Sequence, residues 1–182
     1  MKKIALLIIL VLAAGTASAG DRVFLSAGLA YLHPGDSGYR EVYGGQVLYP
    51  DFQAGIRVFR GLYVVGGFGT FSKNGTTPEL GLPAKSTQSF FTAGLAYIAT
   101  ISKTFGLKLE AGAAEFSYKE EALETSVSGS KLGFEAGLGL LWRGKVLFAG
   151  VNLGYLYGSD TVADVPIKLG GAKASACLGV RF

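Results

Sequence analysis

The last eleven residues alternate strictly in polarity. The even positions from 172 to 182 are all apolar, whereas the odd positions between them hold glycine, small or charged residues. Successive side chains of a β-strand point to opposite faces, so this pattern predicts a strand with one wholly apolar face. Seven more segments carry related patterns, and the eight predicted strands are Val23–Leu32, Val47–Phe59, Leu62–Phe71, Gln88–Ile98, Phe105–Ala114, Lys131–Arg143, Val146–Tyr157 and Ala172–Phe182. The glycine-rich strand Leu62–Phe71 leaves open which of its faces is the apolar one.

The connections between these segments alternate in length. Short turns are predicted at 60–61, 99–103 and 144–145. Long polar loops are predicted at His33–Gly45, Ser72–Thr87, Glu115–Ser130 and Gly158–Pro166. Short turns at one end and long loops at the other, with segments of about ten residues, are typical of outer-membrane barrels.

The apolar faces can point to lipid or to the interior of a soluble carrier barrel. The opposite faces consist mostly of glycine, alanine and serine, which would make a poor soluble surface but fit the narrow interior of an eight-stranded barrel. The apolar faces that can be phased carry no charge, as lipid contact requires. The sequence therefore predicts an all-β protein, a transmembrane antiparallel up-and-down β-barrel of eight strands.

The N-terminus predicts export. Lys2 and Lys3 precede an apolar run from Ile4 to Ala14 and a small-x-small site ending at Ala19. These features are typical of a secretory signal peptide, and the run is too short for a spanning helix. We expect residues 1–19 to be a cleaved signal and residues 20–182 to be the barrel domain.

The composition supports a membrane protein and excludes some other classes. The chain is 49% hydrophobic, with 28 glycines and a mean hydropathy of +0.38. Its formal charge of +4 owes two units to Lys2 and Lys3, so no nucleic-acid surface is indicated. The lone Cys177 cannot form an internal disulfide and is expected to pack as a small side chain.

Several charged residues fall on the faces predicted to line the barrel. In a low-dielectric interior such groups must pair or form hydrogen bonds. The simpler interpretation is a structural network that fills the lumen, and the alternative is an ion path or gate. The predicted lumen network comprises Asp51, Arg57, Lys108, Glu110, Glu135 and Lys173.

The strand pattern and the chain ending resemble the small eight-stranded outer-membrane proteins, the OmpX/OmpA-like barrels, across residues 20–182. The ending, with Leu178, Val180 and Phe182, resembles the signal read by the barrel-assembly machinery. The resemblance implies an integral protein of the bacterial outer membrane, in contact with lipid and lipopolysaccharide, and we expect a monomer. Aromatic residues near strand ends are candidates for the two interfacial girdles; they include Tyr31, Tyr97, Phe105, Trp142 and Tyr155.

No catalytic constellation stands out. The only histidine, His33, is predicted to lie far from Ser89 and Glu115, so a hydrolytic triad is not expected. No cofactor or metal spacing is present, although acidic residues in the long loops leave surface cation binding open. We therefore predict a non-enzymatic structural or surface-interaction protein, with adhesion, envelope integrity or host contact through its four loops. A narrow pore is the alternative, and a lipid-modifying enzyme is a third hypothesis.

Overall fold

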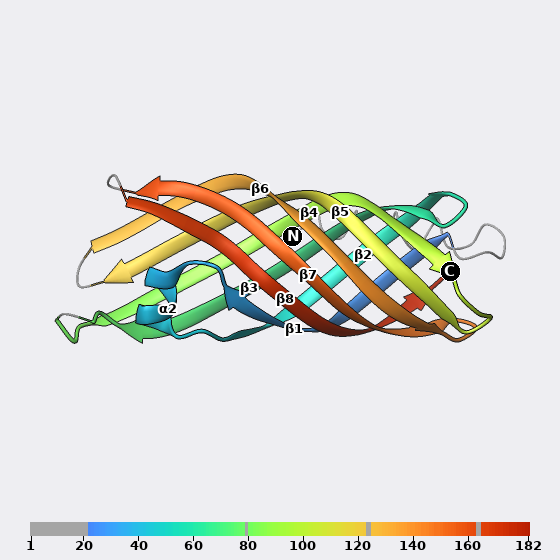
Figure 1. The fold of residues 1–182 in the computed structure, drawn as a ribbon, viewed down its shortest axis with the longest axis horizontal. Helices are drawn as coiled ribbons and strands as arrows, with labels where there is room; N and C mark the ends of the chain where they lie inside the picture. The colour runs from blue at the N-terminus through green and yellow to red at the C-terminus, as the bar shows by residue number, and fades with distance from the viewer. Residues whose placement is uncertain (1–21, 79, 123–124, 163–164) are drawn as a thin grey trace, which may run out of the picture.

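A computed structural model describes residues 22–78, 80–122, 125–162 and 165–182. Eight antiparallel strands form one closed barrel in which each strand pairs with its neighbours in sequence and β1 pairs with β8 (Figure 1). The elements are β1 Val23–Pro34, α2 Ser37–Tyr43, β2 Val47–Phe59, β3 Leu62–Thr76, β4 Pro83–Thr100, β5 Phe105–Ala122, β6 Thr125–Arg143, β7 Leu147–Val162 and β8 Val165–Arg181. This architecture confirms the predicted fold class. The predicted signal peptide lies outside the described residues.

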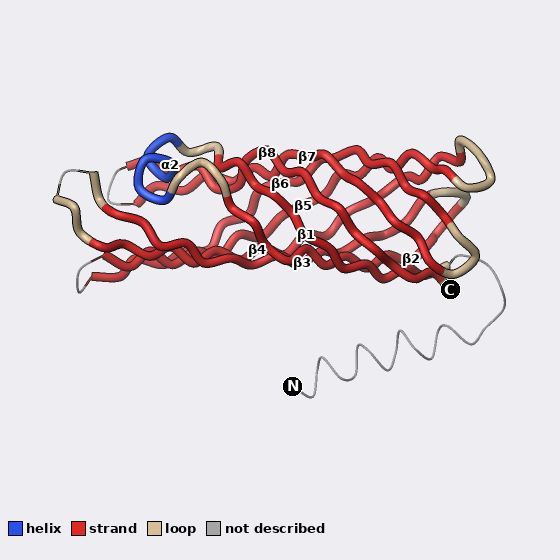
Figure 2. Tube along the Cα trace, turned by 90° about the horizontal axis from the view of Figure 1, so that it is seen from below, coloured by secondary structure: helices blue, strands red, loops and turns tan. Residues whose placement is uncertain are grey.

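The barrel has two distinct ends. The C-terminus and the short connections β2–β3, β4–β5 and β6–β7 lie at one end, here called the terminal end (Figure 1). The other three hairpins and α2 lie at the opposite end, here called the α2 end (Figure 2). In the part of the chain that the structure describes, no helix is long and apolar enough to cross a membrane.

The outer surface changes character along the strands. On β5 the outward residues are apolar from Phe105 to Ala113 and polar from Glu115 onward. The same change occurs on β4 between Phe91 and Ser89, and because Glu115 is the register partner of Phe91, the two boundaries differ by one outward position. A band of exposed apolar side chains therefore surrounds the terminal part of the barrel, and on β4 and β5 a polar wall continues beyond it.

The strands run further than the hydrophobic pattern predicted. Three of the four predicted long loops are mostly strand, because β3–β4, β5–β6 and β7–β8 continue as paired hairpins to their tips. The fourth, His33–Gly45, contains α2, with Asp36 as its N-cap. The prediction was wrong here because the outward positions become serine, threonine and lysine while inward residues such as Phe116 and Tyr118 remain buried. Polarity on the outer face hides the alternation without ending the strand.

The facing of β3, which the sequence left open, is settled by burial. Tyr63 and Val65 point inward and are buried, whereas Val64 is 49% exposed on the outer surface. Both faces of this strand carry large apolar residues, and for that reason its alternation could not be phased.

Candidate functional site

The barrel interior is built in layers. A buried apolar cluster near the α2 end includes Leu32, Tyr49, Phe90, Phe116 and Leu156. A second apolar cluster near the terminal end is centred on Phe24, Tyr63, Leu141 and Phe148. Polar and charged side chains occupy the space between these two clusters, so the interior has an apolar–polar–apolar order.

Two ion-paired groups lie in the polar layer. The Lys173 ammonium lies 3.2 Å from Asp51 Oδ1 and 3.0 Å from Glu135 Oε1, and so joins β8 to β2 and β6. The Lys108 ammonium lies 3.1 Å from Glu110 Oε2, and Gln53 bridges this pair by accepting from Lys108 and donating to Glu110. Five of the six residues predicted for the lumen network therefore lie inside the barrel.

The sixth predicted residue, Arg57, is not brought to these groups. Its side chain is exposed at the terminal end of β2, where a register shift between Arg57 and Phe59 disturbs the pairing with β3. At the rim of a barrel, a residue at an inward-facing position of the alternation need not be buried, because the strand extends beyond the packed interior.

The layered packing bears on the pore hypothesis. Tyr49, Leu32 and Leu156 are each at most 2% exposed and close the polar layer from the α2 end. Phe24 and Phe148 pack edge to face at 5.8 Å on the other side. Ion pairs held between two packed apolar layers favour a structural role for the charges and disfavour an open conduit.

Two gaps interrupt the wall at the α2 end, because neighbouring strands stop pairing before they end. β2 pairs with β3 only from Asp51 towards the terminal end, so the residues of β3 from Thr70 to Thr76 have no partner in β2. β6 pairs with β7 only over Phe134–Arg143. The result is a four-stranded projecting sheet, formed by the polar-faced ends of β3, β4, β5 and β6, that stands apart from the β7–β8 hairpin.

The α2 segment fills the first gap. Tyr43 is buried, and its hydroxyl donates to Glu120 on β5. Asp36 accepts from Tyr39 N–H through one carboxylate oxygen and from Lys168 N–H of β8 through the other, both at 2.8 Å. At Gly75 of β3 an added Cβ would lie 2.3 Å from the Val42 carbonyl oxygen, so only glycine allows this close approach.

The second gap is spanned by side chains. Within the described residues, Thr125–Gly133 of β6 pairs with β5 on one side and has no ladder partner on the other. This segment is here called the β6 edge. The Lys131 ammonium reaches across the second gap to Asp160 Oδ1 of β7 at 3.1 Å, and Tyr118 donates to the other oxygen of Asp160 at 2.7 Å.

The residues weighed for catalysis are dispersed. His33 lies on β1, and its Nδ1 is 2.8 Å from the Gly45 carbonyl oxygen. Glu115 accepts from Ser130 across the β5–β6 pair, and Ser89 lies opposite Ser117. Because β1 pairs only with β2 and β8, His33 is not positioned to act as a base for either group.

The remaining predicted residues lie on the outer surface. On β8, Leu178 is 72% exposed, and Phe182 at the chain end is 44% exposed. Val180 lies between them and is half-buried. Their role as an assembly signal stays a prediction, as does that of the girdle candidates, whose side chains are all exposed on the outside: Tyr31, Tyr97, Phe105, Trp142 and Tyr155.

Comparison with known proteins identifies the fold. No family model matches the chain, and no curated protein matches its sequence significantly. Among solved structures, OprG from Pseudomonas aeruginosa is similar, with a TM-score of 0.69, 13% identity and coverage of 88% of this chain and 96% of that one.

Two further structures agree. Neisserial surface protein A has a TM-score of 0.65 at 13% identity and covers 88% of this chain and 97% of its own. Ail, the attachment invasion locus protein of Yersinia pestis, solved with the heparin analogue sucrose octasulfate, has a TM-score of 0.60 at 18% identity, with coverage of 88% and 98%. The chain therefore has the fold of the small eight-stranded outer-membrane β-barrel proteins.

Proposed function

We propose that this protein is an integral barrel of a bacterial outer membrane that binds an extended polypeptide outside the cell through the β6 edge. In this proposal residues 1–19 are removed on export, and the terminal end faces the periplasm. The role belongs to the surface-interaction class that the sequence predicted, now assigned to one edge in place of four loops.

Membrane insertion is supported by the apolar band. Leu29, Leu138 and Leu153 are all at least 51% exposed, on three different strands. Continuous exposure of large apolar side chains around a barrel is unfavourable in water and favourable in lipid. The fold shared with known outer-membrane barrels points to the same location.

The β6 edge is the single observation that carries the binding proposal. An unpaired strand edge presents backbone donors and acceptors that another chain can join by adding a strand. The β6 edge has Ser126, Ser128 and Ser130 on its outward face and Gly129 at its centre, and its β-ladder is held in place by β5. Lysines that would discourage strand addition are sparse along it, since Lys131 is drawn across the gap to Asp160.

The test uses proline to remove single backbone donors. Consecutive residues of a strand direct their N–H groups to opposite sides, so one of Val127→Pro and Ser128→Pro removes a donor of the β6 edge and the other removes one facing β5. Full-length protein on the surface of a Gram-negative host is scored for binding to fixed epithelial monolayers, before and after the monolayer is treated with protease. Ser117→Ala, on the outward face of β5, is the matched control.

The expected result is protease-sensitive binding that the edge-facing proline variant abolishes and Ser117→Ala leaves intact, with the boiling-dependent gel shift of a folded barrel kept in both. Binding that survives both proline variants would place recognition elsewhere. Cells carrying the protein that bind no better than the bare host would reject the proposal.

A further inference from the structure

A groove crosses the outer surface of β6, β7 and β8 towards the terminal end of the barrel. It forms where small outward residues lie beside large ones in the strand register. Ala149 pairs with both Trp142 and Leu178, which are 50% and 72% exposed, and Ala176 pairs with Val151. All five residues line the groove. An apolar hollow on an exposed surface is typical of a binding groove, and within the lipid-facing band it suits an acyl chain.

The groove ends beside two short turns that are held together. These are the β4–β5 turn at residues 101–104 and the β6–β7 turn at residues 144–146. The backbone N–H of Arg143 donates to the Thr104 carbonyl oxygen at 2.6 Å, next to the register pair of Phe105 with the groove residue at position 142. The two turns therefore lie side by side at the terminal edge of the apolar band.

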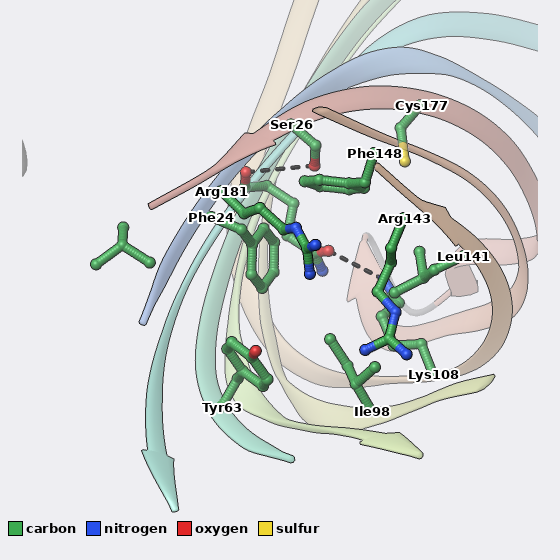
Figure 3. A pocket seen from close by; sticks show the side chains of 12 residues that line it. Phe24, Ser26, Tyr63, Ile98, Lys108, Leu141, Arg143, Phe148, Cys177 and Arg181 are labelled. Carbon is green, nitrogen blue, oxygen red and sulfur yellow. Dashed lines mark hydrogen bonds between the residues drawn. The ribbon is translucent and has the colours of Figure 1, made fainter. Parts of the chain in front are cut away.

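The Arg143 side chain strengthens this link from the inner side of the wall. One of its terminal nitrogens donates to Thr100 Oγ1 at 3.1 Å and to the Phe105 carbonyl oxygen at 3.2 Å. Figure 3 shows this side chain among those that line a small cavity inside the barrel. Arg143 therefore fixes the β4–β5 turn against β6 and is not directed to the groove.

The charge beside the end of the groove is positive and uncompensated. Each of the two turns carries one exposed lysine, Lys103 or Lys145. No acidic residue occurs in 99–107 or 141–149, and neither lysine forms an ion pair with another residue that the structure describes. Lys119 at the α2 end, by contrast, is paired with a carboxylate. The two turns thus attract an anion at the level where a membrane presents its headgroups.

We infer that the groove and the two lysines together bind one anionic phospholipid of the periplasmic leaflet. An acyl chain lies in the groove against Trp142, and the phosphate meets Lys103 and Lys145. A lipid with an unbalanced phosphate complements a groove that is apolar along its length and cationic at its end. A zwitterionic lipid complements it less well, because its own amine offsets the phosphate charge. The inference rests on the membrane insertion and orientation given in the proposed function, and it does not depend on the β6 edge.

The groove contains its own reporter, because Trp142 is the only tryptophan of the chain. The protein is folded into phosphatidylcholine vesicles that contain increasing fractions of phosphatidylglycerol with brominated acyl chains. In a matched series the brominated lipid is phosphatidylcholine. Bromine quenches tryptophan only at short range, so the two quenching curves give the preference of the groove for the anionic lipid. We expect a preference of at least about fivefold, the factor that one lysine contributes near an anionic surface.

Lys103→Gln and Lys145→Gln should each lower this preference, and the double variant should remove it. Arg60→Gln is the matched control, because Arg60 is also an exposed cation at the terminal end but lies in the β2–β3 turn, away from the groove. An equal loss in Arg60→Gln would indicate a general surface potential and would overturn the inference.

Equal quenching by the two brominated lipids, in a barrel that shows the boiling-dependent gel shift of the folded state, would overturn this inference alone. A protein that does not insert into the vesicles would overturn the proposed membrane location as well. The two failures are therefore distinguished by the same samples.

Discussion

The two gaps at the α2 end arise in the same way but are treated differently. In each, a long strand runs past a shorter neighbour or a diverging one and leaves a ladder without a partner. The gap beside β3 is filled by a helix with the buried Tyr43, and the helix and its N-cap make hydrogen bonds to β5 and β8. The gap beside β6 is crossed by the Lys131–Asp160 pair. A covered strand edge contributes stability, whereas an uncovered one stays available for binding. In this barrel the gap beside β3 serves the first use and the gap beside β6 the second.

Both gaps depend on the same rigid barrel below them, and the largest expected effect comes from breaking it. Lys173→Met leaves Asp51 and Glu135 as buried carboxylates without their cation, which should cost about 3–5 kcal/mol of the free energy of unfolding. Urea unfolding in lipid vesicles measures it. Ser175→Ala, the next inward residue on β8, is the control, and an equal loss in the two variants would mean that the ion pairs do not support the barrel.

The boundary between the lipid-facing band and the projecting sheet can be located by moving one charge along β6. Leu138→Arg places arginine in the middle of the apolar band and should destabilise the inserted barrel by about 2–4 kcal/mol, whereas Leu132→Arg should cost about 0–1 kcal/mol at the band's edge. Both residues face outward, at 51% and 74% exposure. Folding yield into vesicles and the urea midpoint report the difference. Similar losses at both positions would show that the membrane covers the base of the projecting sheet. Less of the β6 edge would then lie outside the membrane.

The sequence predicted the barrel because lipid contact demands a repeating apolar position on every strand. The projecting sheet escaped prediction because its outward face is polar and its inward face mixes apolar residues such as Phe116 with polar ones such as Gln88. In short segments this pattern cannot be told from a loop. The α2 helix has one local signal in the sequence, the N-cap residue Asp36, whose side chain accepts from the N–H of Tyr39 three residues later. Its seven residues are too short for periodicity to show, and it is held by tertiary contacts.

The interior shows the same division. The charged residues of the lumen could be found by parity along each strand, but the partner of each charge depends on strand register and barrel shear. Nothing near Lys173 in sequence identifies Asp51, which is 122 residues away. The open β6 edge could not be predicted either, because it exists only where the β5–β6 ladder extends further than the β6–β7 ladder.

The covered gap is predicted to loosen when the tyrosine that anchors α2 loses its hydroxyl. Tyr43→Phe removes the hydrogen bond to Glu120 and should weaken docking of α2 by about 1–2 kcal/mol. A spin label at Ser37→Cys, an exposed position at the start of α2, should become more mobile, while global unfolding of the barrel changes little. Tyr31→Phe, with its ring exposed on the outer surface, is the control. An unchanged label would mean that apolar packing alone holds the helix.

Raising the pH should loosen the same helix without any substitution. Burial raises the pKa of Tyr39 to about 12, and the charge of Glu120 adds to this effect. An undocked tyrosine ionises near pH 10, so the docked state binds more protons above that pH, and its stability should fall as pH rises from about 10 to 12. The spin label at position 37 should gain mobility over this window. Mobility that is constant up to pH 12 would contradict the docked geometry.

The open gap provides the smallest expected effect on stability and the most direct test of the comparison. The Lys131 side chain is 48% exposed, and exposed ion pairs contribute little, so Lys131→Met should leave the unfolding midpoint unchanged within error. Lys119→Met is the control, because the Lys119 side chain is similarly exposed, at 51%, and its pair with Glu121 does not span a gap. Hydrogen exchange should rise at Ser159–Thr161 of β7 in Lys131→Met alone, since that side of the gap loses its link to β6. If binding to epithelial monolayers also increases in this variant, the pair acts as a restraint on the β6 edge. A clear fall in the unfolding midpoint of Lys131→Met would instead make the second gap a closed one, and the contrast between the two gaps would disappear.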